Sequence, residues 1–164
     1  MVLGGTHSIS TVLTIATFHL LSKPAMLGAL REELLAAVHD ETQLPTWAKL
    51  ETLPYLSAVV LESLRLMHGV ASRISVVATD EELEYVGQWQ RPSASTITET
   101  SYSIPRGYAV GVSAYMVHTN PTLFHDPSSF LPERWLDADG QRTKGLERHI
   151  LSFAKGNRQC VGMQ

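Results

Sequence analysis

The chain has 164 residues, enough for one domain with a hydrophobic core. Hydrophobic residues make up 44% of it and charged residues 18%, as in ordinary globular proteins, and the net charge of −3 argues against a nucleic-acid partner. Its one cysteine excludes an internal disulfide framework.

The first predicted element is a helix from the start of the chain to about Leu21. Its apolar residues recur at helical spacing. They are Ile9, Val12, Leu13, Ala16 and Leu20. Residues 9–21 are apolar enough to resemble a signal peptide, but no Lys or Arg precedes Lys23, and the stretch is too short to span a bilayer. We therefore predict a buried helix and no membrane anchor in this chain.

Three more helices are predicted before residue 70. Pro24 suits the first turn of the second helix, which should end near Asp40. Residues 45–50 are predicted to form a short helix. Leu53–Pro54 opens another long helix, apolar on one face, and Gly69 ends it.

The second half of the chain reads as short strands and irregular segments. Residues 74–78 are rich in β-branched side chains and predict a strand, and residues 108–112 predict another. Residues 88–103, rich in Ser and Thr, read as a long exposed loop. Three X-Pro pairs punctuate an irregular coil over residues 120–156. No internal repeat or clear domain boundary is found, and the predicted fold class is mainly α with small β-sheets.

Cys160 is the first candidate site residue. A lone cysteine is most often an inert buried thiol or an incidental surface thiol, but its neighbours favour a ligand. An iron-bound thiolate needs positive charge and amide donors around it. Arg158 supplies charge, Gly156 permits a turn with positive φ, and Gly162 lets backbone approach a flat cofactor.

Glu62 and Arg65 form the second candidate. Residues three apart on a helix share a face, and most such pairs are solvated and weak. Here Leu61, Leu64 and Leu66 flank the pair, which suggests partial burial. A partly buried pair needs a third charged partner, and Arg134 is a candidate.

Three motifs, in this order, resemble the cytochrome P450 superfamily. They are Glu62-x-x-Arg65, Pro132-Glu133-Arg134-Trp135, and the loop from Phe153 through Gly156 and Arg158 to Cys160 and Gly162. The last motif is highly specific and the other two are weak alone. The resemblance covers the whole chain, from the central helix that crosses the haem to just past the cysteine loop, and is strongest to fungal microsomal-type members. It implies the C-terminal portion, incomplete, of the haem-thiolate monooxygenase fold.

The resemblance implies a role for each matched residue. Cys160 would be the proximal thiolate ligand of the haem iron. Arg158 would pair with a haem propionate, and Arg73 lies near the place of another propionate partner. Phe153, Gly156 and Gly162 would shape the ligand loop around the cofactor. Glu62, Arg65 and Arg134 would form the family's structural ion-pair triad.

The first helix resembles the family's distal helix less closely. The sequence Gly4-Gly5-Thr6-His7-Ser8 keeps glycines, such as Gly5, that open room for dioxygen. Ser8 retains a hydroxyl where the family has threonine, and His7 replaces an acid. Imidazole can relay protons near neutral pH, so both are candidate catalytic residues. His7 is equally well read as a polar residue at a helix end.

The resemblance implies an activity and partners. The haem would split dioxygen and insert one oxygen atom into a small apolar organic substrate, such as a secondary metabolite. Electrons would come from an NADPH-dependent reductase. Intact relatives are often anchored to the endoplasmic reticulum membrane, which leaves the location of this chain open.

The chain also departs from the family. Residues 1–164 read as one partial haem-binding domain without the family's N-terminal half and last helix, and residues 91–103 look like an inserted loop. The alternative reading is therefore a truncated, inactive remnant with little haem binding or catalysis. A small helical binding protein unrelated to haem is a third reading, which the ordered motifs disfavour.

Overall fold

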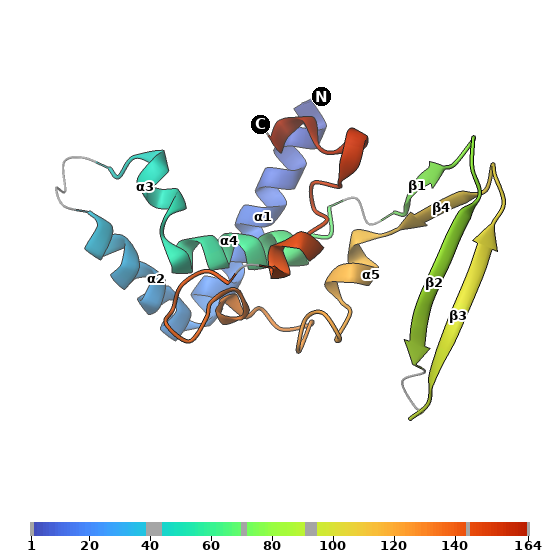
Figure 1. Cartoon of the computed structure of the whole chain (residues 1–164). Coiled ribbons are helices and arrows are strands. Elements are labelled where there is room, and N and C mark those ends of the chain that lie inside the picture. The colour runs from blue at the N-terminus through green and yellow to red at the C-terminus, as the bar shows by residue number, and fades with distance from the viewer. Residues whose placement is uncertain (1, 39–43, 70–71, 91–94, 144, 164) are drawn as a thin grey trace. The chain divides into compact units, whose positions relative to one another are not determined.

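The structure, a computed structural model, divides the chain into two compact units (Figure 1). It describes residues 2–38, 44–69, 72–90, 95–143 and 145–163, without the side chains of residues 2–4 and 158. Unit 1 is Met1–Ser72 together with Ser113–Gln164, and unit 2 is Arg73–Val112. Helices dominate the described residues and the sheets are small, which confirms the predicted fold class. The sequence contains no visible signal for the division into two units.

The five α-helices among the described residues belong to unit 1. They are α1 (Val2–Ser22), α2 (Pro24–Ala37), α3 (Trp47–Glu51), α4 (Pro54–Leu66) and α5 (Ala114–His118). Prolines in the first turn begin α2 and α4, as predicted, because their fixed φ suits a first turn. The predicted end of α2, near Asp40, lies outside the described residues. The helix α5 was not predicted.

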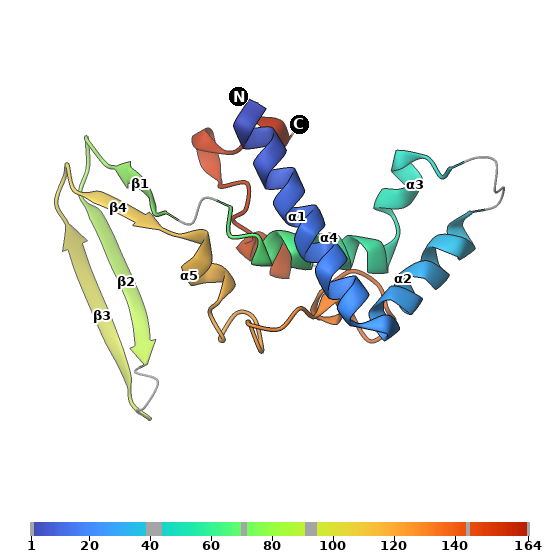
Figure 2. The ribbon, with the colours of Figure 1, turned by 180° about the vertical axis from the view of Figure 1, so that it is seen from behind.

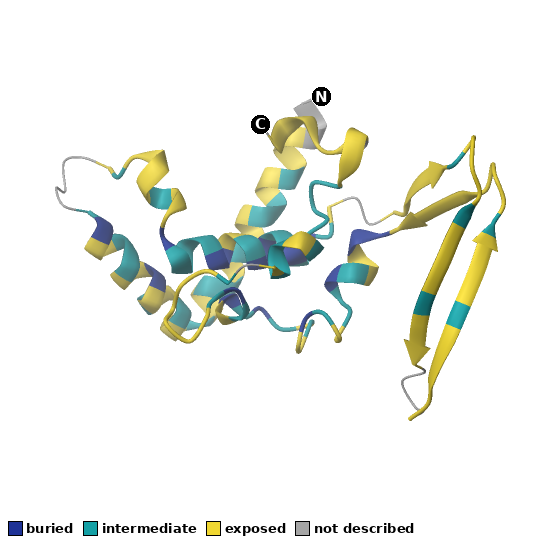
Figure 3. Ribbon diagram, in the orientation of Figure 1, coloured by how far each residue is buried: buried dark blue, intermediate teal, exposed yellow. Residues whose placement is uncertain are grey.

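The helix α4 is the centre of unit 1. It contacts α1, α2, α3 and the 3₁₀ turn η1 (Pro132–Trp135), and Figure 3 shows the concentration of buried residues along it. Ala58 of α4 packs with Phe124 and Trp135, and none of the three is more than 1% exposed. Burying such aromatic side chains contributes about 2–3 kcal/mol each. The core of unit 1 therefore lies where α4 meets residues 124–135.

The first helix crosses α4, but its apolar side chains are not buried as predicted (Figures 1 and 2). On one side the ring of His19 stacks on that of Phe130, with centroids 4.4 Å apart. On the other side four apolar residues are 60–69% exposed. These are Ile9, Leu13, Phe18 and Leu21. The predicted helix is confirmed, but the spacing of apolar residues does not show how many faces of a helix are buried by packing.

Unit 2 consists of two antiparallel strand pairs. The strand β1 (Ile74–Val77) pairs with β4 (Ala109–Val112), close to the two strands predicted. The strand β2 (Leu83–Gln90) pairs with β3 (Ile97–Ile104) along its whole length. The prediction of an exposed loop over residues 88–103 is therefore wrong for β3. A strand exposed on both faces carries no alternation of apolar and polar residues, so the usual strand signal is missing.

The coil predicted over residues 120–156 is irregular as expected, with short 3₁₀ turns. Besides η1 these are η2 (Leu146–His149) and η3 (Gly156–Arg158), and η4 (Val161–Met163) follows near the C-terminus. Among the described residues, no single helix is long and apolar enough to cross a membrane. Residues of α1 and α2 reach that length and composition only as a pair, bent by 109°.

Glu33 of α2 caps the start of α4. Its two carboxylate oxygens accept hydrogen bonds from the backbone N–H groups of Tyr55 and Leu56, each at 2.8 Å. These N–H groups belong to the first turn of α4, which has no acceptor for them within the helix. A carboxylate at this position also interacts favourably with the helix dipole.

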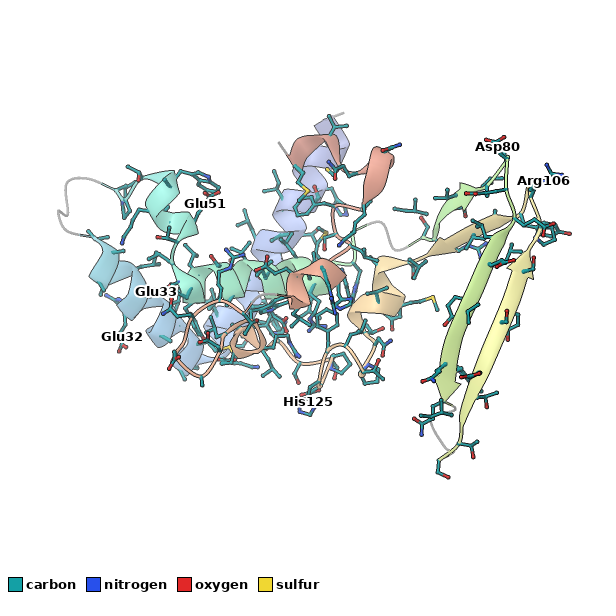
Figure 4. All side chains as sticks on the ribbon, in the orientation of Figure 1. Glu32, Glu33, Glu51, Asp80, Arg106 and His125 are labelled. Atoms are coloured by element: carbon teal, nitrogen blue, oxygen red, sulfur yellow. The ribbon has the colours of Figure 1, made fainter. Side chains whose placement is uncertain are left out.

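We predict that Glu33→Gln lowers the free energy of unfolding by about 1 kcal/mol, because it removes the charge and one acceptor from the α4 cap. Urea denaturation of the 164-residue chain measures this change. The matched control is Glu32→Gln, on the exposed neighbouring residue (Figure 4). Equal losses in the two variants would contradict the capping role.

Candidate functional site

Cys160 lies exposed in the loop that follows η2. Its backbone N–H donates to the carbonyl oxygen of Phe153 at 2.8 Å, and the N–H of Gln159 donates to the carbonyl of Gly156 at 3.1 Å. The turn η4 begins directly after the cysteine. The loop therefore closes on itself and presents the thiol at its surface.

Two residues with positive φ turn this loop. Ala154 has φ +55° and Gly156 has φ +74°. Glycine adopts such angles without strain, whereas alanine does so at a cost of about 1 kcal/mol. The surrounding hydrogen bonds hold Ala154 in this conformation, which places the segment leading to Cys160 on the far side of a sharp turn.

Two glycines of the sequence motifs have space for an added Cβ atom. A Cβ added to Gly162 would lie 3.8 Å from the sulfur of Cys160, so a longer side chain there would crowd the thiol. At Gly5 of α1, an added Cβ would meet no atom within 4 Å. Figures 1 and 2 both show the Cys160 loop at the same end of unit 1 as the first turns of α1. The exposed thiol of Cys160, with Gly162 beside it, has the chemistry that a thiolate-ligated cofactor requires.

A groove of about 460 Å³ separates the loop from α4. Leu61 and Leu64 form its α4 side, and Phe153 and Ile150 line the other. Phe153 is half-buried here, and its backbone carbonyl holds Cys160. The aromatic side chain thus lies across this groove from Leu61 and Leu64 of α4.

The structure describes the basic candidate residues to different extents. The backbone of Arg158 belongs to η3, and its side chain lies outside the described residues. Arg73 belongs to unit 2, is exposed, and precedes β1. The ammonium of Lys155 in the Cys160 loop donates to the backbone carbonyl of Arg148. The roles predicted for Arg158 and Arg73 stay predictions.

His7 and Ser8 lie in the first turns of α1. His7 is exposed, and its carbonyl accepts hydrogen bonds from the hydroxyls of Ser10, at 3.0 Å, and Thr11, at 2.8 Å. Ser8 is half-buried. The hydroxyls of Ser10 and Thr11 are therefore taken up by the helix backbone, and the imidazole of His7 faces open space.

The carboxylate of Glu62 lies at the centre of a buried hydrogen-bond network in unit 1. It is fully buried and accepts hydrogen bonds from Arg65, Arg134, the backbone N–H of Leu131 and the indole N–H of Trp135. The distances lie between 2.8 and 3.2 Å. A buried carboxylate is costly unless such donors surround it.

The two arginines tie Glu62 to the segment that follows α5. Arg65 is fully buried and donates to three backbone carbonyls as well as to Glu62. These are the carbonyls of His118, Pro127 and Ser129. Arg134 contacts Glu62 at 3.2 Å and donates to the carbonyls of His125 and Asp126. The structure thus brings together the three charged residues that the sequence grouped.

His118 is a buried polar residue that the sequence did not single out. It is the last residue of α5 and has no exposed surface. Its Nε2 accepts a hydrogen bond from the backbone N–H of Leu151, at 2.9 Å, at the entrance of the Cys160 loop. Burial lowers the pKa of His118 to about 4 and outweighs the hydrogen bond to the backbone of Arg65, which raises it. The charge of His68 acts in the same direction as burial. A lone histidine in a short helix offers no sequence signal for this contact.

We predict that Glu62→Gln destabilises the chain by about 3–5 kcal/mol, because it leaves the buried guanidinium of Arg65 without its counter-charge. The loss is measured by urea denaturation, or as loss of a cooperative transition. Glu51→Gln, at an exposed position of α3 (Figure 4), is the matched control and should change stability by less than about 0.5 kcal/mol. Equal stability of the two variants would refute the central role of Glu62.

We also predict that stability falls as pH is lowered from 6.5 to about 4. The unfolded chain protonates His118 near its ordinary pKa of 6.5, whereas burial holds the folded pKa near 4, so protons favour the unfolded state in this window. The contribution is on the order of 3 kcal/mol. The charged and titratable groups that act on the ring are Glu62, Arg65 and His68.

Urea denaturation at several pH values tests this dependence. His118→Gln should flatten the fall in stability between pH 6.5 and 4, and the exposed control His125→Gln (Figure 4) should keep it. A wild-type slope in His118→Gln would contradict the assignment.

The chain is similar to several known fungal proteins. The chain is 44% identical over 171 residues to the cytochrome P450 monooxygenase ppzE of Metarhizium rileyi and 39% identical over 164 residues to the cytochrome P450 monooxygenase ucsK of Acremonium sp.. It is 42% identical over 161 residues to the conidiogenone synthase PchP450 of Penicillium rubens. These alignments cover 97–99% of this chain.

The chain spans 28–42% of the length of these three relatives. The profile of the cytochrome P450 family matches residues 1–164. The match runs through both the Glu62 motif and the loop of Cys160. On this evidence the chain belongs to the cytochrome P450 family.

Proposed function

We propose that this chain forms the part of a haem-thiolate monooxygenase domain that carries the iron ligand, Cys160. The observation that carries the proposal is the exposed thiol, presented by a self-closing loop that is joined to α4. A thiolate that ligates iron must be accessible and held in place, and the loop meets both requirements. The match to the cytochrome P450 family supports this reading.

The Cys160 loop would hold the haem through the thiolate of Cys160. Gly156 and Gly162 would let the backbone approach the cofactor closely, and Phe153 would pack beside the ligand loop. From the sequence resemblance, Arg158 would pair with one propionate by a charge-assisted hydrogen bond and Arg73 with the other.

The first turns of α1 would supply further residues of the site. Gly5 leaves room beside the helix for a small ligand. Ser8 donates or accepts a hydrogen bond through its hydroxyl, and His7 passes protons from solvent because imidazole gains and loses them near neutral pH. The exposure of His7 supports a route to bulk water.

The bound haem supplies oxygen activation and the insertion of one oxygen atom into an organic substrate. The chain orients that cofactor through Cys160 and maintains the site through Glu62, Arg65 and Arg134. The substrate class we propose is a small apolar secondary metabolite. The names of the fungal relatives, a conidiogenone synthase among them, support it.

The electron donor we propose is an NADPH-dependent reductase that docks on the face of the Cys160 loop. Exposed basic residues near the loop support this choice. They are Arg148 and Lys155. A reductase with an acidic docking face would be drawn to them by electrostatic attraction.

We predict that the haem-loaded chain, reduced and treated with carbon monoxide, shows the strongly red-shifted Soret band of thiolate ligation. Cys160→Ser should abolish that shift, because the chain has no other cysteine. Asn157→Ser, an exposed change in the same loop, should preserve it. A red shift that persists in Cys160→Ser, or its absence in the unchanged chain, would overturn the proposal.

A further inference from the structure

Two hydrogen bonds join the entrance of the Cys160 loop to helices distant in sequence. The backbone N–H of Leu151 donates to Nε2 of His118 at 2.9 Å. The hydroxyl of the next residue, Ser152, donates to the backbone carbonyl of Leu64 in α4 at 2.6 Å. Consecutive residues of the loop are therefore attached to α5 and to α4.

The backbone of His118 is itself held in place. Its backbone carbonyl accepts a hydrogen bond from Nη1 of Arg65 at 2.8 Å. Phe124 meets the ring edge-on, with centroids 6.3 Å apart, and His68 lies 6.2 Å away. The anchor for Leu151 is thus fixed to the same buried network that surrounds Glu62.

The hydrogen bond also defines the state of the imidazole. Since Nε2 accepts from an N–H group, the neutral ring carries its proton on Nδ1. A protonated ring would have no lone pair for Leu151. Burial lowers the pKa of His118 to about 4, so the accepting form persists at neutral pH.

The path from this anchor to the sulfur is short. Leu151 precedes Ser152 and Phe153, and the carbonyl of Phe153 accepts the backbone N–H of Cys160 at 2.8 Å. A shift of Leu151 would therefore move the acceptor that places Cys160. His118 and Leu64 fix the start of the loop. The hydrogen bond between Cys160 and Phe153 then links the position of Cys160 to the start of the loop.

We infer that His118 and Ser152 are positioning residues, which fix the thiol of Cys160 by holding the entrance of its loop. The inference rests on the proposed function only where it says that the held thiol is an iron ligand. The attachment itself involves no cofactor. It extends the site by two residues that neither touch the thiol nor belong to the three sequence motifs.

Hydrogen exchange of backbone amides in the haem-free chain tests the attachment. His118→Phe fills the space of the ring without an acceptor and should reduce protection about tenfold at Leu151 and Cys160. His118→Gln places an amide oxygen near the position of Nε2 and should restore most of it. The amides of Tyr55 and Leu56, bound by Glu33, are the internal reference for global unfolding.

Ser152→Ala is the second variant, for the case that His118→Phe also exposes Tyr55 and Leu56. It should reduce protection at Leu151 and Cys160 while the reference amides keep theirs. The exposed control His125→Phe should change none of these amides. Unchanged protection at Leu151, or a loss at Leu151 that leaves Cys160 untouched, would overturn the inference.

A spectroscopic readout separates this inference from the proposed function. In the haem-loaded chain, His118→Phe and Ser152→Ala should lower the fraction of carbon monoxide-bound haem with the red-shifted band, and His118→Gln should recover it. If the wild-type chain lacks that band, the proposed function is refuted. The hydrogen-exchange data then still test whether His118 and Ser152 hold the loop. A full red-shifted fraction in both variants would refute positioning.

Discussion

The buried carboxylate of Glu62 is the interaction on which unit 1 depends. Two arginines, a backbone amide and an indole N–H surround it. These donors offset the cost of burying the charge and join the segments that carry them. Arg65 uses its remaining donors on backbone carbonyls from α5 and the segment that follows it. A helix and a coil with little regular structure of its own are thereby held in one arrangement.

The same network reaches toward the candidate site. Arg65 holds the backbone of His118, His118 holds Leu151, and the loop beyond Leu151 presents Cys160. Through these contacts the Glu-x-x-Arg motif has a role beyond stability. It helps to hold the loop of Cys160, and the position of a metal-ligating side chain depends on such supporting contacts.

The sequence predicted the parts of this arrangement that follow from local spacing. Glu62 and Arg65 lie three residues apart on an apolar helix, so their pairing is readable from the chain alone. The strand at residues 97–104 was missed because both its faces are exposed and its pattern carries no alternation. His118 was missed because its partner, Leu151, is 33 residues away and contributes only a backbone N–H. Such a contact cannot be predicted from the sequence, because every residue except proline has a backbone N–H group.

The central claim is that the sulfur of Cys160 binds the haem iron. Because the chain has one cysteine, growth on ³⁴S-labelled cysteine places a heavy sulfur at a single thiol, whereas the methionines can be kept unlabelled. The most direct measurement is the resonance Raman spectrum of the ferric, haem-loaded chain. The account predicts an iron–sulfur stretching band that moves to lower frequency with the heavy isotope. A spectrum of bound haem in which no band responds to the isotope would contradict it.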